Sequence, residues 1–142
     1  MNELITRDVE YTHDATRMIG YLCAPPRAEE LPGILLIHDA FGLSDDMIDI
    51  ADGLAVLGFG VFAADVWWER TRPATEQQIG PLIGGMVSDR ERWIGRVAAA
   101  HHTIGKQPEI DASAVVVLGY CFGGSSAIEY VRTGGDVRGA VS

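Results

Sequence analysis

Short apolar runs alternate with stretches of helical period along this chain. This alternation predicts an α/β layer architecture with a mainly parallel sheet. The later apolar runs are continuous, as expected for strands buried on both faces, and the first two are joined by a short turn that favours an antiparallel hairpin. Strands are expected at residues 4–11, 18–23, 34–37, 61–64, 114–118 and 137–141.

Helical periodicity predicts three helices and a weaker fourth. Ser44 is the expected N-cap of the first helix, and a capping box of Ser88 and Glu91 opens the second. In the weaker stretch, residues 76–86, a Gly-Pro and a Gly-Gly pair are expected to break the helix. The three clear helices are expected between Ser44 and Gly58, from Ser88 to about Ile104, and over residues 122–132.

Length and composition narrow the class of protein. The 142 residues are enough for one domain, expected to span residues 1–142, and 47% hydrophobic with 22% charged residues is ordinary for a globular chain. Disorder and coiled coil are therefore excluded as overall classes. The two cysteines, Cys23 and Cys121, form no disulfide framework, and the first residues do not resemble a secretion signal. A cytoplasmic location is expected.

The charge balance excludes some partners. Eleven Lys and Arg residues against 20 Asp and Glu residues give a net charge of −9. Nucleic acids and anionic membrane surfaces are bound largely through Lys and Arg, so we expect neither as a partner. The adjacent histidines His101 and His102 point about 100° apart on a helix, unlike a pair of zinc ligands. No metal and no cofactor are expected.

One segment carries a recognisable chemical motif. Gly119, Cys121, Gly123 and Gly124 form a G-x-C-x-G-G pattern between an apolar strand and a helix. This is the pattern of a nucleophile elbow, with cysteine in place of serine, in which a sharp turn exposes the nucleophile and requires small neighbours. The helix that begins at Phe122 offers free N–H groups to an oxyanion, and its dipole favours the thiolate. A buried, inert cysteine at a glycine-rich turn is the alternative interpretation.

A second segment, residues 38–42, follows the strand expected beside the elbow strand. In folds with a nucleophile elbow, the loop at this position supplies a second oxyanion N–H group. Asp39 would then lie near the thiol, although it could equally cap a turn of its own loop. His38 is expected to orient this loop, and contact with the reacting centre is the less favoured alternative.

These segments, with Gly60 to Asp65, resemble the dienelactone hydrolase family of the α/β-hydrolase superfamily. The resemblance extends from about Leu4 to Val141. It implies that Cys121 is the nucleophile of a Cys–His–Asp triad. It also implies that Phe122 and Ala40 supply the oxyanion-hole N–H groups and that Asp39 is the acid in contact with the thiol.

The order of the triad indicates that part of such an enzyme is missing. In α/β-hydrolases the nucleophile is followed by the acid and then the histidine, but no histidine follows Cys121. We therefore expect a partial α/β-hydrolase fold, equivalent to about the first 60% of such an enzyme, without the C-terminal strands. The last strand would then leave an open sheet edge through which the chain could self-associate.

The expected function is hydrolysis of a small-molecule carboxylic ester or lactone by a cysteine nucleophile. Two alternatives remain open. One is a protein similar to the class I glutamine amidotransferases, which also place cysteine on a G-x-C-x-G turn. The other is a non-catalytic interaction module, because the triad histidine and acid are absent from this sequence.

Overall fold

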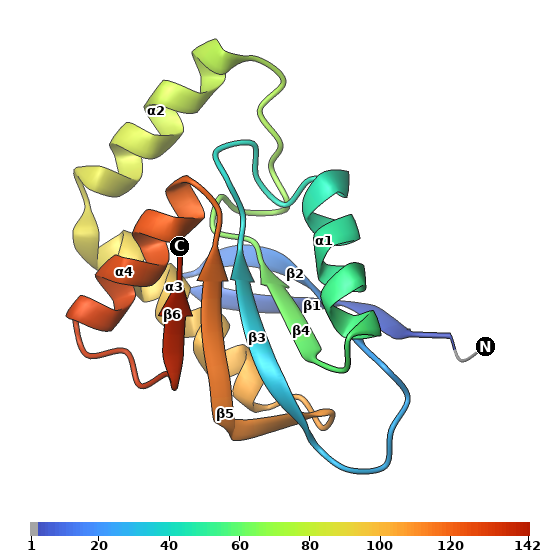
Figure 1. Cartoon of the computed structure of the whole chain (residues 1–142). Helices are drawn as coiled ribbons and strands as arrows, with labels where there is room; N and C mark the ends of the chain where they lie inside the picture. Colours follow the sequence, from blue (N-terminus) through green and yellow to red (C-terminus); the bar gives the residue numbers. More distant parts are fainter. Residues whose placement is uncertain (1–2) are drawn as a thin grey trace.

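The structure is a computed structural model that describes residues 3–142, built around a six-stranded sheet (Figure 1). The strand order is β1-β2-β4-β3-β5-β6. β1 and β2 form an antiparallel hairpin and β2 is antiparallel to β4, whereas β4, β3, β5 and β6 are mutually parallel. The expected architecture is confirmed. The strands are β1 (Ile5–His13), β2 (Thr16–Ala24), β3 (Leu31–Ile37), β4 (Gly60–Ala64), β5 (Ile110–Gly119) and β6 (Gly139–Val141).

Helices cover both faces of the sheet because the side chains of the central strands alternate between two cores. Ile34 and Leu36 of β3 pack in a cluster with α1, whereas Leu35 and Ile37 pack in a cluster with α3 and α4. Helix α2 projects from the end of the molecule at which β3 and β5 terminate (Figure 1). The helices are α1 (Asp45–Val56), α2 (Glu76–Val87), α3 (Arg90–Gly105) and α4 (Phe122–Arg132).

The structure corrects the prediction for the segment between β4 and β5. Helix α2 is continuous and contains Pro81, although a break was expected there. Proline removes one helical hydrogen bond, and the carbonyl acceptor of that bond belongs to the solvent-exposed Gln77, which water can reach. Asp89, not Ser88, is the N-cap of α3, because the backbone N–H of Ser88 is bonded to Gly84 and so ends α2.

The last strand is shorter than predicted. β6 covers Gly139–Val141, whereas the apolar pattern indicated a strand from Val137. The N–H of Val137 is bonded to the carbonyl of Gly135 in a turn, and ladder-like bonding begins only with Arg138, which donates to Val115. Within residues 3–142, no helix is long and apolar enough to cross a membrane.

Candidate active site

Cys121 lies at the turn between β5 and α4 with an unusual backbone conformation. Its φ and ψ angles are 56° and −112°, outside the regions that L-residues normally occupy. A conformation of this kind costs on the order of 1–3 kcal/mol and persists only where the surrounding structure enforces it. The side chain is exposed at the carboxyl end of the sheet, at the N-terminus of α4. This is the strand–turn–helix geometry that the motif predicted, and the role of Cys121 as a nucleophile stays a prediction.

The glycines of the motif are required by close packing. A Cβ atom on Gly119 would lie 2.6 Å from the backbone nitrogen of Gly124 and would also overlap the carbonyl group of Gly123. A Cβ atom on Gly123 would overlap the carbonyl oxygen of Ile37 and lie 2.6 Å from that of His38. The obstacle to a side chain at Gly123 is therefore the end of the neighbouring strand, β3.

The two predicted oxyanion donors, Ala40 and Phe122, lie in segments that meet where the elbow contacts the end of β3. The backbone N–H of Tyr120 donates to the carbonyl of Ile37 at 3.2 Å, which holds the elbow against the end of β3. Phe122 is the first residue of α4, so its N–H has no acceptor within the helix. The chain from β3 continues directly into the loop that contains Ala40. Two converging backbone N–H groups can stabilise a tetrahedral oxyanion. That Ala40 and Phe122 supply such a pair stays a prediction.

Two tryptophans fix these segments. The indole N–H of Trp67 donates to the carbonyl of Ala40 at 3.0 Å, and its ring stacks on Phe122 with centroids 4.7 Å apart. Trp93 stacks on the same phenyl ring at 5.7 Å, and its N–H donates to the hydroxyl of Ser126, which in turn donates to the carbonyl of Phe122. Trp67 is fully buried, so it contacts Ala40 and Phe122 from the interior of the protein.

His38 determines the orientation of the loop after β3. It is fully buried, and the N–H of Val66 donates to its Nε2 at 3.0 Å. The proton therefore lies on Nδ1, which donates to the carbonyl of Asp39 at 2.7 Å. That carbonyl belongs to the same planar peptide unit as the N–H of Ala40. Burial lowers the pKa of His38, which favours the neutral ring that this arrangement needs.

Asp39 adopts the turn-capping arrangement that was one of its two interpretations. Its carboxylate accepts the N–H of Phe41 at 2.9 Å within its own loop. The carbonyl of Asp39 also accepts the N–H of Gly42 at 3.2 Å. The side chain therefore stabilises the loop, and its role as an acid in contact with the Cys121 thiol stays a prediction.

A buried polar network beneath the site was missed from the sequence. The carboxylate of Asp65 accepts the N–H groups of Ile19 and Arg70 at 3.0 and 2.6 Å. The guanidinium of Arg96 donates to the carbonyls of Val66 and Trp67 at 2.7 and 2.5 Å. Burial lowers the pKa of Arg96. The sequence signal that could have indicated this network was Arg96, a charged residue on the otherwise apolar face of a predicted helix. In residues 3–142, no three metal-ligating side chains come together.

Cys121 opens into a cavity of about 380 Å³ between α2, α3 and α4. This volume lies in the range of small-molecule sites. The cavity is lined by Ile83, Val87, Trp93, Cys121, Phe122 and Ser125.

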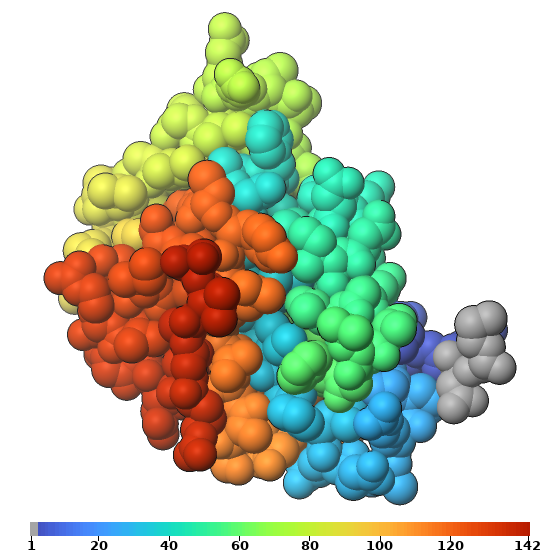
Figure 2. Space-filling view, viewed as in Figure 1, coloured from blue at the N-terminus to red at the C-terminus, as the bar shows by residue number. Residues whose placement is uncertain are grey.

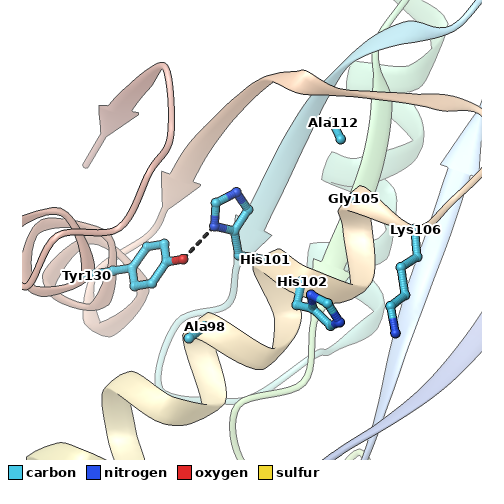
Figure 3. A pocket seen from close by; sticks show the side chains of 7 residues that line it. All are labelled: Ala98, His101, His102, Gly105, Lys106, Ala112 and Tyr130. Carbon is cyan, nitrogen blue, oxygen red and sulfur yellow. Dashed lines mark hydrogen bonds between the residues drawn. The ribbon is translucent and has the colours of Figure 1, made fainter.

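A second cavity, of about 410 Å³, lies at the C-terminal half of α3 (Figure 3). In its lining, His101 Nδ1 and the hydroxyl of Tyr130 form a hydrogen bond. Its lining includes neither of the cysteines, and the remaining polar side chains are His102 and Lys106. Of these two cavities, the one beside Cys121 is lined by residues of the elbow.

The two cysteines are expected to differ in reactivity towards iodoacetamide. Cys121 is exposed, whereas Cys23 is fully buried, and burial raises the pKa of the Cys23 thiol. Because the thiolate is the reacting form, limited labelling and peptide mapping should find Cys121 modified first. Preferential modification of Cys23 would contradict the elbow geometry.

Comparison with known proteins agrees with this fold and motif. The dienelactone hydrolase family model matches residues 18–142. A dienelactone hydrolase-like promiscuous phosphotriesterase, P91 from metagenomic libraries, is 35% identical with a TM-score of 0.92, covering 96% of this chain and 57% of that chain. The solved structure of m3DLH is 32% identical with a TM-score of 0.93 and the same coverage.

A curated relative is also similar. It is a probable 2-oxo-3-(5-oxofuran-2-ylidene)propanoate lactonase of Bradyrhizobium sp, 24% identical over 115 residues, which are 81% of this chain and 46% of that protein. The chain thus spans about half the length of this relative. It belongs to the dienelactone hydrolase family, within the α/β-hydrolase superfamily. The fold and the family are those of hydrolases.

Proposed function

We propose that this chain carries the nucleophile and the oxyanion site of a hydrolase that cleaves a small carboxylic ester or lactone. The observation that carries the proposal is the strained, exposed Cys121 at the N-terminus of α4, with the anchored loop of Ala40 beside it. The family match supports the same chemistry.

The proposed step is acylation of the thiol. The sulfur of Cys121 forms a bond to the ester carbonyl carbon, and the N–H groups of Phe122 and Ala40 stabilise the oxyanion. When the tetrahedral intermediate collapses, the C–O bond breaks and the alcohol leaves with the proton of the thiol. Asp39 belongs to this proposal as the acid expected near the thiol, in addition to its contact with Phe41.

Release of the acyl group requires a general base that activates water. His38 precedes the oxyanion loop, but both of its ring nitrogens are already bonded to the backbone. No histidine follows Cys121 in the sequence. We therefore propose that the 142-residue chain is acylated without sustained turnover.

The test is a burst assay with p-nitrophenyl acetate on the 142-residue chain. A burst of at most about one equivalent of p-nitrophenol is expected, since only the Cys121 thiol of each chain is acylated, and only once. Cys121→Ala should abolish the burst, whereas Cys23→Ala, a matched change at the buried thiol, should retain it. A burst that survives Cys121→Ala would contradict the proposal. A parallel assay with aryl amides separates ester chemistry from that of amidotransferase-like proteins.

The second candidate function is a non-catalytic interaction module. The observation that favours it is the position of β6 at the end of the strand order, where within residues 3–142 it pairs with β5 alone, with Val141 56% exposed. An open edge can pair with a strand of another copy. A specific dimer by native mass spectrometry, together with no ester burst, would favour this function over hydrolysis.

A further inference from the structure

The cavity beside Cys121 lacks any group that would recognise a charged substrate. None of its six lining residues, which come from the described part of the chain, is charged. Apart from the thiol, the polar side chains are Ser125 and Trp93, and the indole N–H of Trp93 is already donated to Ser126 at 2.9 Å. Ile83, Val87 and the Phe122 ring complete an apolar wall.

The arginines on the surrounding elements are already bonded to protein acceptors. Arg92 donates to the carbonyl of Gly85 at 2.7 Å, and Arg90 forms an ion pair with Glu129 at 2.6 Å. Arg96 is buried beneath the site and donates to two backbone carbonyls. In the loop after β4, Arg70 donates to Ile19, Gly20 and Asp8, and Arg72 donates to Leu43 and Asp45. Among the described residues, Nε of Arg92 and Nε of Arg96 have no hydrogen-bond partner, but neither arginine lines the cavity.

Helix α2 supplies one wall of the cavity from outside the main body. Met86 is its only buried residue, and Leu82 and Ile83 pack against the core, so α2 is attached along its C-terminal half. Its first turn, residues 76–78, is exposed, and the helix projects from the molecule (Figure 2). Val87, at the C-terminal end of α2, lines the cavity and is 57% exposed. A hydrocarbon chain of a substrate bound beside Cys121 would cover the exposed side chain of Val87.

From these contacts we propose that the cavity between α2 and α4 binds the acyl part of an uncharged, apolar ester. This inference rests on the proposed function and specifies its substrate class. The carbonyl lies at Cys121, and the hydrocarbon chain extends along Ile83 and Val87. Each methylene removed from water contributes about 0.8 kcal/mol when fully buried, so affinity for the cavity increases with chain length.

The first experiment tests the cavity without relying on hydrolysis. Alkyl methanethiosulfonates transfer their alkylthio group to a thiolate and release methanesulfinate. The reagents are the methyl, butyl and hexyl compounds and the sulfonatoethyl compound, with glutathione as the reference thiol. Relative to glutathione, the rate at Cys121 should increase at least about tenfold from methyl to hexyl. The sulfonate should react more slowly than the butyl reagent. Equal relative rates for methyl and hexyl, or a faster sulfonate, would overturn the proposal.

Two matched variants test whether the increase in labelling rate from methyl to hexyl arises in this cavity. Val87→Asp places a charge in the cavity and should remove most of the hexyl-to-methyl gain. Val56→Asp makes the same change at an exposed position of α1, 71% accessible, and should keep the gain. If Val56→Asp removed the gain as completely as Val87→Asp, binding would not lie in this cavity, and the proposal would fail.

A second experiment separates this inference from the proposed function. The burst rate with p-nitrophenyl hexanoate should exceed that with the acetate, and the hemisuccinate should be slowest. Chain-length-dependent thiol labelling without any ester burst would support the apolar cavity but contradict the hydrolase. An ester burst that is fastest with the hemisuccinate would support the hydrolase but overturn the apolar cavity.

Discussion

Replacement of Gly123 by alanine is expected to destabilise the chain by at least about 3 kcal/mol, the upper end of the usual cost of overpacking a core. The added Cβ atom would overlap the carbonyl oxygen of Ile37, and that oxygen already accepts the N–H of Tyr120. A backbone atom in a parallel ladder cannot move without disturbing β3 and β5 together. The melting temperature should fall by about 10 °C, given about 2–4 °C per kcal/mol for a chain of about this size.

Gly53→Ala is the matched control, because Gly53 also lies within a helix. A Cβ atom there meets nothing within 4 Å, and the backbone is not left-handed. The variant should be stabilised by about 0.5–1 kcal/mol, the usual difference between glycine and alanine in a helix. Thermal melts followed by circular dichroism measure both changes. A Gly123→Ala protein that melts like the parent would show that β3 does not confine the elbow.

His38→Leu is expected to reduce both stability and the rate of the ester burst. Without the imidazole, the buried N–H of Val66 loses its acceptor, at a cost of about 1–3 kcal/mol. The Asp39 carbonyl also loses one of its two donors and keeps only the N–H of Gly42, so the N–H of Ala40 is held less firmly in one direction. Loss of one oxyanion donor typically costs about 100-fold or more in rate. Stopped-flow measurement of p-nitrophenol release gives the burst rate.

Alkylation of Cys121 distinguishes positioning from a general structural defect. Iodoacetamide needs no oxyanion hole, so His38→Leu should leave its reaction with Cys121 at the parent rate. A parallel loss of alkylation and acylation would mean that His38 only supports the fold. His38→Gln offers both an amide donor and a carbonyl acceptor, and it should partly restore the burst.

The same residue makes stability depend on pH. Because burial lowers the pKa of His38, the unfolded chain binds more protons than the folded chain once pH falls below the ordinary value of 6.5. This stability is fully present above pH 6.5 and is lost progressively as pH decreases towards the folded pKa. The nearby Asp39 and Asp65 carboxylates oppose the shift, and burial lowers the pKa of His101 as well. Urea titrations at a series of pH values measure the free energy of unfolding. As pH decreases, this free energy should fall less steeply for His38→Gln than for the parent, although it should still fall.

The sequence by itself determined the layers of the fold and the place of the strand–turn–helix elbow that contains Cys121. Continuous apolar runs predicted the buried parallel strands, and the helix over residues 122–132 was found as predicted. The elbow was recognisable because its requirements are local. A strand, a turn with glycines two residues either side of Cys121, and a helix all lie within one short segment. The structure differed from the prediction in α2 and at the start of α3. The continuity of α2 through Pro81 depends on solvent exposure, and the start of α3 depends on which residue caps it, and composition describes neither well.

Only the tertiary structure decided how the site is supported and which residues line the cavity beside it. His38, Trp67 and Arg96 act through partners 28, 27 and 30 residues away, in the loops that follow β3 and β4. No periodicity in the sequence reports which backbone carbonyl a buried side chain will reach. The apolar cavity likewise appears only when Ile83 and Val87 of α2 are placed opposite Cys121. Local patterns specify elements because their physical causes are local, whereas the shape and charge of the site arise from contacts between segments distant in the chain.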